Sequence, residues 1–457
     1  MTDKTILVKN ADLLLTMDPA RERIPGGGMF IRGNVIESVG PTDELPGEAD
    51  KVIDASGMLI MPGLINIHHH LYQTLTRALP GAQNAKLFDW LVRLYPVWGE
   101  LTDEAVYVST RLGLAELALT GCTTSTDHLY ILPNDCKHDT EIRAARELGI
   151  RFHATRGSMS RGESKGGLPP DHVVEDEDAI LKDSQRVIEA FHDPEPYAMT
   201  RVALAPCSPF SVTADLMRET THLARAYKNV MLHTHVAETR DEEEYTLEKV
   251  GLRPARYMEE LGWVGDDVWW VHCIWLTDDE VDLMAETGTG VAHCPSSNMR
   301  LGSGIAPIIQ MVEKGVKVGI GVDGSASNDA GHMIMETRNA LMLQRVANGA
   351  ESFTVMDALR LATTGSAAAI NRPDLGRLGP GQAADFIGVR LDRMEMAGGA
   401  VHDSAAAMLL SPPLTVDINV VNGREIVVDG KLVDVEVPEL VREQNRIAKA
   451  MAEKHPA

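Results

Sequence analysis

The sequence lacks an excess of positive charge, a long apolar run and an obvious export signal. Its 457 residues carry a formal net charge of −23, and because a polyphosphate surface would repel such a chain, we expect no nucleic-acid partner. No apolar run approaches the roughly 20 residues that cross a bilayer, which argues against a membrane partner. The amino terminus has no basic segment followed by an apolar core, so no secretory signal is predicted.

Cysteine is also scarce and shows no regular spacing. The five cysteines are odd in number and form no C-x-x-C motif, which is typical of reduced thiols in a cytosol. With 44% hydrophobic and 24% charged residues and no low-complexity tract, the composition is that of a soluble globular protein. We predict a cytoplasmic homo-oligomer that acts on a small molecule.

The two ends of the chain share a β-rich pattern. Residues 1–61 read as short strands with tight turns, including the hairpin signal Gly33-Asn34. Residues 373–457 contain a strand at 384–389 and end in a charged segment of helical period. Neither end has enough strands for a core, so we expect both to combine in one small β-sandwich domain, followed by a surface helix.

Residues 62–372 alternate apolar β-type runs with helix-patterned stretches. We count eight strand–helix units, the number that closes a parallel (β/α)₈ barrel of the TIM type. The predicted strands end at His70, Asp127, Arg156, Cys207, His235 to Glu238, His272, Asn298 and Asp323. In such barrels the chemistry lies at the carboxyl ends of the strands, so these polar residues should surround the active site.

The first predicted barrel strand ends in three consecutive histidines. Side chains on a strand alternate between faces, so His68 and His70 share one face and His69 points to the other. Two imidazoles on one face can bind one metal ion, and imidazole suits zinc, iron or nickel. The alternative is a polar strand end with solvated histidines. We expect His69 to be a packing residue.

The fifth predicted strand carries a second pair of histidines. His233 and His235 have the same strand parity, so this pattern does not choose a ligand between them. Glu238 lies just past the strand, where a buried carboxylate near a cation could move a proton. The alternative for Glu238 is a salt bridge at a strand end.

The sixth, seventh and eighth predicted strands also end in polar residues. His272 is either a catalytic histidine or a core residue, and the stretch that ends at Asn298 is either part of the site or a capped helix start. Gly319 and Gly321 share a face with Asp323 and leave the barrel interior open below its carboxylate. That carboxylate could bind a metal and accept a proton from water.

The segment 157–170, which follows the third predicted strand, is long, glycine-rich and polar. Two interpretations remain open at this point. One is a mobile surface loop, and the other is a lid over the active site.

These motifs together resemble those of the amidohydrolase superfamily. The resemblance rests on Pro-Gly-Leu-Ile-Asn-x-His-x-His in strand one, His-x-x-Glu in strand five, His in strand six and Asp in strand eight. It implies one divalent metal ion, zinc or alternatively iron, held by His68, His70, His235 and Asp323. It also implies catalytic roles for Glu238, His272 and Asp323. Binuclear members carry a bridging lysine at the end of strand four, and residues 202–207 contain none.

Within the superfamily, longer stretches are similar to the 8-oxoguanine deaminase group of purine, pterin and triazine aminohydrolases. These stretches are 70–77, 87–91, 155–160, 205–210 and 324–329. By resemblance to guanine deaminases, Gln73 and Trp90 would contact the substrate, although Trp90 could equally be a core or surface residue. Guanine deaminases present an arginine after strand four, where this chain has Cys207 and Ser208. That difference favours an 8-oxo base over guanine.

The predicted activity is therefore hydrolytic deamination, with 8-oxoguanine converted to urate and ammonia. Hydroxytriazine and chlorotriazine hydrolases share several of the same stretches, and isoxanthopterin or guanine deamination is a further alternative. Some barrels of this superfamily have lost their ligands and serve as binding proteins. The complete ligand set in this chain argues against that last interpretation.

Overall fold

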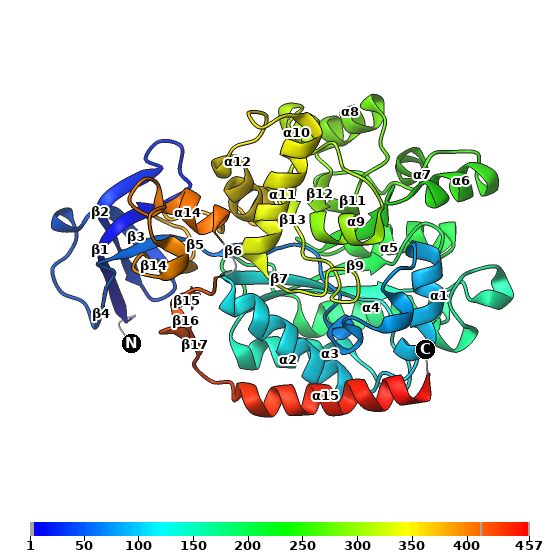
Figure 1. The fold of residues 1–457 in the computed structure, drawn as a ribbon. Coiled ribbons are helices and arrows are strands. Elements are labelled where there is room, and N and C mark those ends of the chain that lie inside the picture. The colour runs from blue at the N-terminus through cyan, green and yellow to red at the C-terminus, as the bar shows by residue number, and fades with distance from the viewer. Residues whose placement is uncertain (1–3, 412–413, 456–457) are drawn as a thin grey trace.

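A computed structural model describes residues 4–411 and 414–455, and it shows a barrel with a smaller sheet beside it (Figure 1). Within these residues, eight parallel strands close the barrel, in which the last strand pairs with the first. The barrel strands are β6 (Leu64–Asn66), β7 (Cys122–Leu129), β8 (Arg151–Ser158), β9 (Thr200–Pro206), β10 (Met231–Val236), β11 (Val268–His272), β12 (Gly290–His293) and β13 (Val318–Ile320). They are almost entirely buried because helices cover their outer face.

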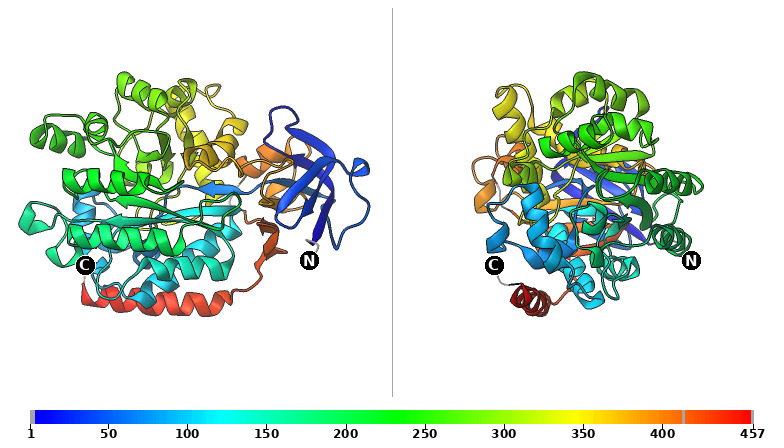
Figure 2. Two further views of the ribbon diagram at one scale, coloured as in Figure 1. Left: turned by 180° about the vertical axis from the view of Figure 1, so that it is seen from behind. Right: turned by 90° about the vertical axis from the view of Figure 1, so that its right-hand side faces the viewer.

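The helices surround the strands, as the end-on view in Figure 2 shows. Several begin at a threonine or aspartate whose side chain accepts a hydrogen bond from the first turn, as Thr102, Asp176 and Thr213 do. The helices of this part are α1 (Leu87–Trp98), α2 (Asp103–Leu119), α3 (His138–Leu148), α4 (Glu177–Phe191), α5 (Ala214–Arg225), α6 (Arg240–Lys249), α7 (Pro254–Glu260), α8 (Asp278–Thr287), α9 (Pro295–Leu301), α10 (Ile308–Glu313), α11 (Met333–Asn348), α12 (Val355–Arg360) and α13 (Ser366–Ala369).

The smaller sheet is built from both ends of the chain. Its strands are β1 (Thr5–Leu15), β2 (Arg23–Arg32), β3 (Val35–Pro41), β4 (Lys51–Asp54), β5 (Met58–Pro62), β14 (Phe386–Arg390), β15 (Ile418–Val421), β16 (Arg424–Val428) and β17 (Lys431–Leu432). β14 pairs antiparallel with β5, which joins the two ends in one hydrogen-bonded sheet. Ile6 and Met29 pack in one apolar core with Phe386 and Val420. The predicted (β/α)₈ barrel with a small β-domain from both chain ends is confirmed.

Two further helices follow the barrel, α14 (Ser404–Leu410) and the carboxyl-terminal α15 (Val437–Lys454). α15 runs along the outside of the barrel (Figure 2) and packs against α2. Leu440 and Ile447 are buried in this contact. Gln444 of α15 is also buried, and its Nε2 donates a hydrogen bond to Thr74 Oγ1 at 3.0 Å. The last helix therefore contacts the segment that follows the three histidines.

The glycine-rich segment 157–170 is attached to the neighbouring strand–helix connection. The backbone N–H groups of Ser160 and Arg161 both donate to Ser211 O at 3.1 Å. All five cysteines lie in the described part of the chain, where they are buried free thiols. Over the same residues, no helix is both long and apolar enough to cross a bilayer.

A buried ion pair connects the barrel to the smaller sheet. Arg151, at the start of β8, donates to both carboxylate oxygens of Asp385, from Nε and from Nη2, at 3.0 Å each. The Arg151 side chain is fully buried, and Asp385 also accepts a hydrogen bond from the backbone N–H of Asn422. This bidentate pair explains why a charged residue follows the alanines at 383–384.

We expect Asp385→Asn to lower the free energy of unfolding by about 3–5 kcal/mol, because Arg151 would remain buried without its counter-charge. Urea titration of the purified variant measures the change. Glu37→Gln is the matched control, because Glu37 pairs with Arg32 at the surface, where an ion pair contributes about 1 kcal/mol or less. Equal effects of the two substitutions would contradict the assignment of Asp385 as the connecting residue.

Candidate metal centre and active site

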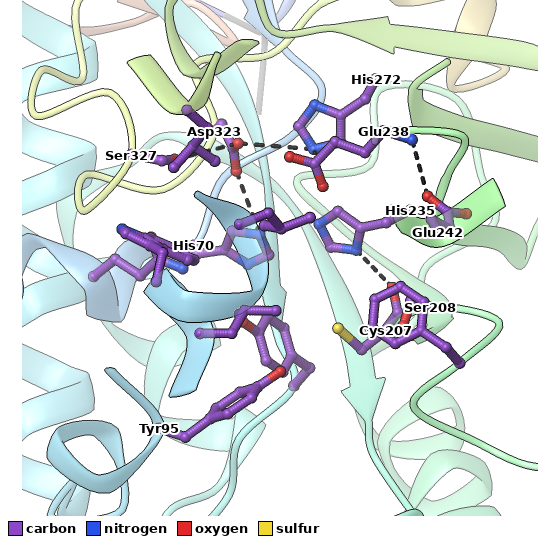
Figure 3. A pocket seen from close by; sticks show the side chains of 17 residues that line it. His70, Tyr95, Cys207, Ser208, His235, Glu238, Glu242, His272, Asp323 and Ser327 are labelled. Carbon is purple, nitrogen blue, oxygen red and sulfur yellow. Dashed lines mark hydrogen bonds and ion pairs between the residues drawn. The ribbon is translucent and has the colours of Figure 1, made fainter. Parts of the chain in front are cut away.

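A cavity opens at the carboxyl ends of the barrel strands (Figure 3). The predicted site residues that line it are His70, Gln73, Trp90, Cys207, Ser208, His235, Glu238, His272 and Asp323. The other lining residues, which the sequence analysis did not name individually, are Leu87, Leu91, Tyr95, Tyr130, Phe210, Glu242, Leu301 and Ser327. Leu87, Leu91, Phe210 and Ser327 lie in the stretches that carried the family resemblance. Of the described residues in segment 157–170, none lines this cavity. A lid role for that segment therefore has no support.

Five histidines and one aspartate cluster at the polar end of the cavity, where His70, His235, His272 and Asp323 line it and His68 and His128 lie behind them. His68 Nε2 and His70 Nε2 lie 3.2 and 3.4 Å from Asp323 Oδ1. One nitrogen from each of His68, His70, His128 and His235 lies within 4.8 Å of the others, and a second such group joins His68, His272 and Asp323. The predicted ligands are thus brought together, with His128 beside them.

The imidazoles in this cluster are held from behind by backbone carbonyl groups. His70 Nδ1 donates to His128 O at 2.7 Å, and His235 Nδ1 donates to Cys207 O at 2.6 Å. A carbonyl only accepts hydrogen bonds, so it places the proton on Nδ1 and leaves the lone pair on Nε2. Both lone pairs are therefore available to a metal ion.

His233 supports the cluster instead of joining it. Its Nδ1 donates to Trp269 O at 2.9 Å, so its Nε2 is an acceptor. His68 Nδ1 donates to that Nε2 at 2.8 Å, which leaves the lone pair of His68 on Nε2. The two histidines of strand β10, which the sequence pattern left equivalent, therefore have different positions. His235 lies in the cluster and His233 lies behind His68.

These residues fit a divalent metal ion. His68 Nε2 is buried and has no hydrogen-bond partner within residues 4–411 and 414–455. Two ligand atoms about 2.0–2.1 Å from one tetrahedral zinc are roughly 3.3 Å apart, close to the separations of Asp323 from the two histidines. Burial lowers the pKa of His68 and of His235 well below the ordinary value, so both are neutral at pH 7, as metal ligands must be.

Asp323 is ionised in this arrangement. Burial alone would raise the pKa of its carboxyl group, but a proton on His68 or on a neighbouring imidazole lowers that pKa well below its usual range, and a metal cation in place of that proton would act in the same direction. Asp323 also has a left-handed backbone with φ of 60°, as do Ala237 and His272 with φ of 54° and 71°. Such non-glycine conformations are uncommon and gather at functional sites, where surrounding packing holds them.

Glu238 and His272 lie on the cavity side of the cluster. Glu238 Oε2 is 3.6 Å from His272 Nε2, which is itself 3.8 Å from Asp323 Oδ2. Asn298 also belongs to this arrangement, because its Oδ1 accepts a hydrogen bond from His272 Nδ1 at 2.9 Å. Burial raises the pKa of Glu238 to about 7, although His272 opposes the shift. A carboxyl group with this pKa can both donate and accept a proton at neutral pH.

The predicted substrate residues line the same cavity. Trp90 is buried there, and its Nε1 donates to Ala326 O at 3.1 Å, so its ring orientation is fixed. Gln73 lies against Gly324, where any Cβ would come within 1.9 Å of Gln73 Oε1. Ser208 Oγ is buried and finds no hydrogen-bond partner in the described part of the chain.

Glu242 is the most informative residue that the sequence analysis missed. Its two carboxylate oxygens accept hydrogen bonds from the backbone N–H groups of Ala237 and Glu238, both at 2.9 Å. Thr239 and Glu242 have the spacing of a helix capping box, which would normally predict only a helix start. Here the carboxylate reaches past Thr239 and fixes the backbone that carries Glu238.

The apolar part of the cavity also escaped prediction. Leu87 and Leu91 come from α1, Phe210 from the segment after β9 and Leu301 from the end of α9. The rings of Phe88 and Phe210 lie 5.5 Å apart. Nothing in their local sequence distinguishes them from core residues. His128 gave a weak signal, because it is a histidine in a strand that ends at Asp127 in the pattern and at Leu129 in the structure.

Comparison with known proteins agrees with this geometry. The model of the amidohydrolase family matches residues 59–433. The chain belongs to the amidohydrolase family. It is 44% identical over 428 residues to an 8-oxoguanine deaminase from Pseudomonas aeruginosa, covering 93% of this chain and 95% of that protein. It is 37% identical to a hydroxydechloroatrazine ethylaminohydrolase from a Pseudomonas species, covering 96% and 94% of the two chains.

A solved structure shares the whole architecture. Atrazine chlorohydrolase from Arthrobacter aurescens TC1, complexed with zinc, superimposes with a TM-score of 0.92 at 33% identity, covering 97% of this chain and all of that one. An isoxanthopterin deaminase from an unknown prokaryotic organism is 33% identical, over 98% of both chains. The chain is therefore an aminohydrolase enzyme, and its reaction type is metal-dependent hydrolysis of a carbon–nitrogen bond.

We expect Glu242→Gln to reduce turnover by roughly 10–100-fold, because its amide nitrogen would face one backbone N–H and release the loop that carries Glu238. Initial rates of ammonia release, measured with metal content on the same samples, check this. Glu244→Gln is the matched control, since Glu244 is exposed on the same helix. Unchanged turnover in Glu242→Gln would show that the two backbone bonds do not position Glu238.

Proposed function

We propose that this enzyme deaminates a planar aminated heterocycle, and that the substrate is 8-oxoguanine, which is hydrolysed to urate and ammonia. The observation that carries the substrate assignment is the unpartnered Ser208 Oγ in the cavity wall, beside the uncharged Cys207. Similarity to an 8-oxoguanine deaminase over nearly the whole chain supports it.

In the proposed mechanism, His68, His70, His235 and Asp323 hold one divalent ion, zinc or alternatively iron. When bound, the ion would activate water as a nucleophile at neutral pH. Asp323 takes a proton from the attacking water, and Glu238 protonates the ring nitrogen next to the amine-bearing carbon. His272 orients the water and stabilises the tetrahedral centre. Asp323 then passes its proton to the amine, which leaves as ammonia, and the new hydroxyl group returns a proton to Glu238 as the carbonyl forms. One water is consumed for each ammonia released.

Two observations support Glu238 as the proton donor. It lies outside the group of converging ligand nitrogens, on the cavity side and 3.6 Å from His272. Its raised pKa of about 7 gives a substantial protonated fraction at neutral pH. The two backbone bonds from Glu242 keep it in this position.

The recognition of the base is assigned to the predicted substrate residues of the cavity wall. Gln73 can donate and accept, which suits the carbonyl and ring N–H edge of a guanine-like base. Trp90 provides a flat apolar surface, and Ser208 would hydrogen-bond the 8-oxo group where Cys207 leaves room. An unpaired polar group in such a site costs about 1–3 kcal/mol, so pairing of Ser208 favours the oxidised base.

The apolar part of the cavity favours a free base over a nucleoside. Relatives of this chain include 5'-deoxyadenosine deaminases, at 32% and 30% identity. Ribose hydroxyl groups need polar partners, whereas the apolar part of this cavity is formed by Leu87, Leu91, Phe210 and Leu301. We therefore assign a compact base as the substrate.

The rival substrates are s-triazines, isoxanthopterin and guanine, and relatives named for the first two support keeping them in the comparison. A catalytically inactive binding protein is disfavoured, because every predicted ligand is present in the cluster. We also propose the boundaries 1–61, 62–372 and 373–457 for the two domains. The homo-oligomer and the cytoplasmic location stay predictions from the sequence.

The metal assignment predicts one equivalent of zinc or iron per chain, lost together with activity in His70→Ala. Glu238→Gln should keep the metal while turnover falls by about 10²–10⁴-fold, because a general acid–base group is removed without disturbing the ligands. Elemental analysis and ammonia release are measured on the same preparations. Two tightly held equivalents, or loss of metal in Glu238→Gln, would contradict the proposed roles.

The substrate assignment predicts a kcat/KM for 8-oxoguanine at least tenfold above that for guanine, which corresponds to about 1.4 kcal/mol in transition-state binding. Ser208→Ala should reduce this preference while leaving the rate with guanine nearly unchanged, since guanine lacks the 8-oxo group. Isoxanthopterin and a hydroxytriazine are assayed under the same conditions. A clear preference for the triazine would assign the enzyme to the rival substrate class and leave the mechanism standing.

A further inference from the structure

One face of helix α1 lines the cavity, and the last residue of that face carries a hydroxyl group. Leu87, Trp90, Leu91 and Tyr95 follow one another at helical spacing, so they lie on the same side of the helix. The first three offer apolar or aromatic surface to a base, and the indole N–H of Trp90 already donates to Ala326 O. Tyr95 differs from them, because its phenol can both donate and accept a hydrogen bond. Neither the metal site nor the proposed proton transfers use this hydroxyl group.

The Tyr95 hydroxyl group is enclosed by protein and faces the cavity. The whole residue is only 1% exposed. In Figure 3 its hydroxyl group points into the cavity, and none of the dashed lines between the drawn side chains reaches it. A polar group that is shielded from water is unfavourable without a hydrogen bond. A substrate with an acceptor at this place would supply the missing partner.

Cys207 is a neighbour of this hydroxyl group. Burial raises the pKa of Tyr95 well above its ordinary value, and Cys207 and Tyr72 add to that shift. The phenol therefore keeps its proton at neutral pH and can act as a donor. Ser208 follows Cys207 directly, and its Oγ is buried without a hydrogen-bond partner within residues 4–411 and 414–455. Two hydroxyl groups from different segments, α1 and the turn after β9, thus lie near Cys207 in one cavity.

We propose that Tyr95 is a specificity-determining residue, whose hydroxyl group donates a hydrogen bond to the 8-oxo carbonyl of the substrate together with Ser208. A carbonyl oxygen has two lone pairs, so it can accept both hydrogen bonds. Guanine has a C–H group at the same position and leaves both hydroxyl groups without this partner. The inference rests on the proposed function, because it assigns the residues that distinguish 8-oxoguanine from guanine.

The variant Tyr95→Phe removes the hydroxyl group and keeps the ring. We expect kcat/KM for 8-oxoguanine to fall by about tenfold, and kcat/KM for guanine to fall by no more than about twofold, because guanine offers no acceptor there. Tyr107→Phe is the matched control, since the Tyr107 hydroxyl group donates to Glu147 at the surface, away from the cavity. That variant should keep both rates.

Equilibrium binding provides a second measurement. Quenching of tryptophan fluorescence gives the dissociation constants of both bases in the slow variant Glu238→Gln, with and without Tyr95→Phe. We expect weaker binding of 8-oxoguanine and little change for guanine. In the double variant of Tyr95→Phe and Ser208→Ala, the preference for 8-oxoguanine in kcat/KM should disappear, because both donors to the 8-oxo carbonyl are gone.

Equal losses with the two bases in Tyr95→Phe would show that Tyr95 only supports the packing of the cavity. That result would overturn this inference and leave the proposed function intact. An unsubstituted enzyme that shows no preference for 8-oxoguanine over guanine would instead overturn the proposed substrate.

Discussion

The active site depends on hydrogen bonds that hold each imidazole by the nitrogen that faces away from the cavity. Cys207 O holds His235, His128 O holds His70, and the chain from Trp269 O through His233 holds His68. Backbone carbonyls cannot donate, so the strands themselves select the tautomer of every ligand. For His68 this selection passes through the side chain of His233, whose own tautomer is set by Trp269 O. The barrel therefore presents converging lone pairs as a consequence of strand register, and a cation is the natural partner for them.

Folding this site costs free energy, and packing in the rest of the molecule offsets that cost. Left-handed backbone at Ala237, His272 and Asp323 costs on the order of 1–3 kcal/mol per residue, and buried lone pairs without a cation add to this. The barrel is enclosed by helices, and the sheet from both chain ends is anchored on it through the buried pair of Arg151 and Asp385. α15 adds a contact from Gln444 to the segment behind the cavity. These contacts lie far from the reacting groups, but the free energy they contribute to folding offsets the cost of the strained backbone.

The sequence predicted the metal-binding residues near the strand ends well. Side chains on a strand alternate between its two faces, and this two-residue period can be read directly from the sequence. It predicted His68 and His70 on one face of the first strand and Asp323 at the eighth strand end. In the structure β6 ends at Asn66 and β13 at Ile320, so all three residues lie just past their strands, and both histidines still reach Asp323. Parity could not separate His233 from His235, since both point into the barrel and only the depth of the ring differs. The two backbone hydrogen bonds to Glu242 and the apolar part of the cavity could not be predicted, because they depend on which loops meet in space. The lid interpretation of segment 157–170 stays a prediction, since none of these residues lines the cavity in this structure.

Chemistry and recognition are thus carried by different parts of the chain. The reacting groups lie at strand ends, whereas the recognising wall comes from the segment around α1 and from the turn after β9. Relatives with the same architecture are named for purine, pterin and triazine substrates, as expected if the wall changes while the strand ends stay. Cys207 shows how one residue can serve both parts. Its carbonyl holds the ligand His235, and its side chain lines the cavity. A side-chain change there alters the substrate surface while the backbone bond that orients the ligand is kept.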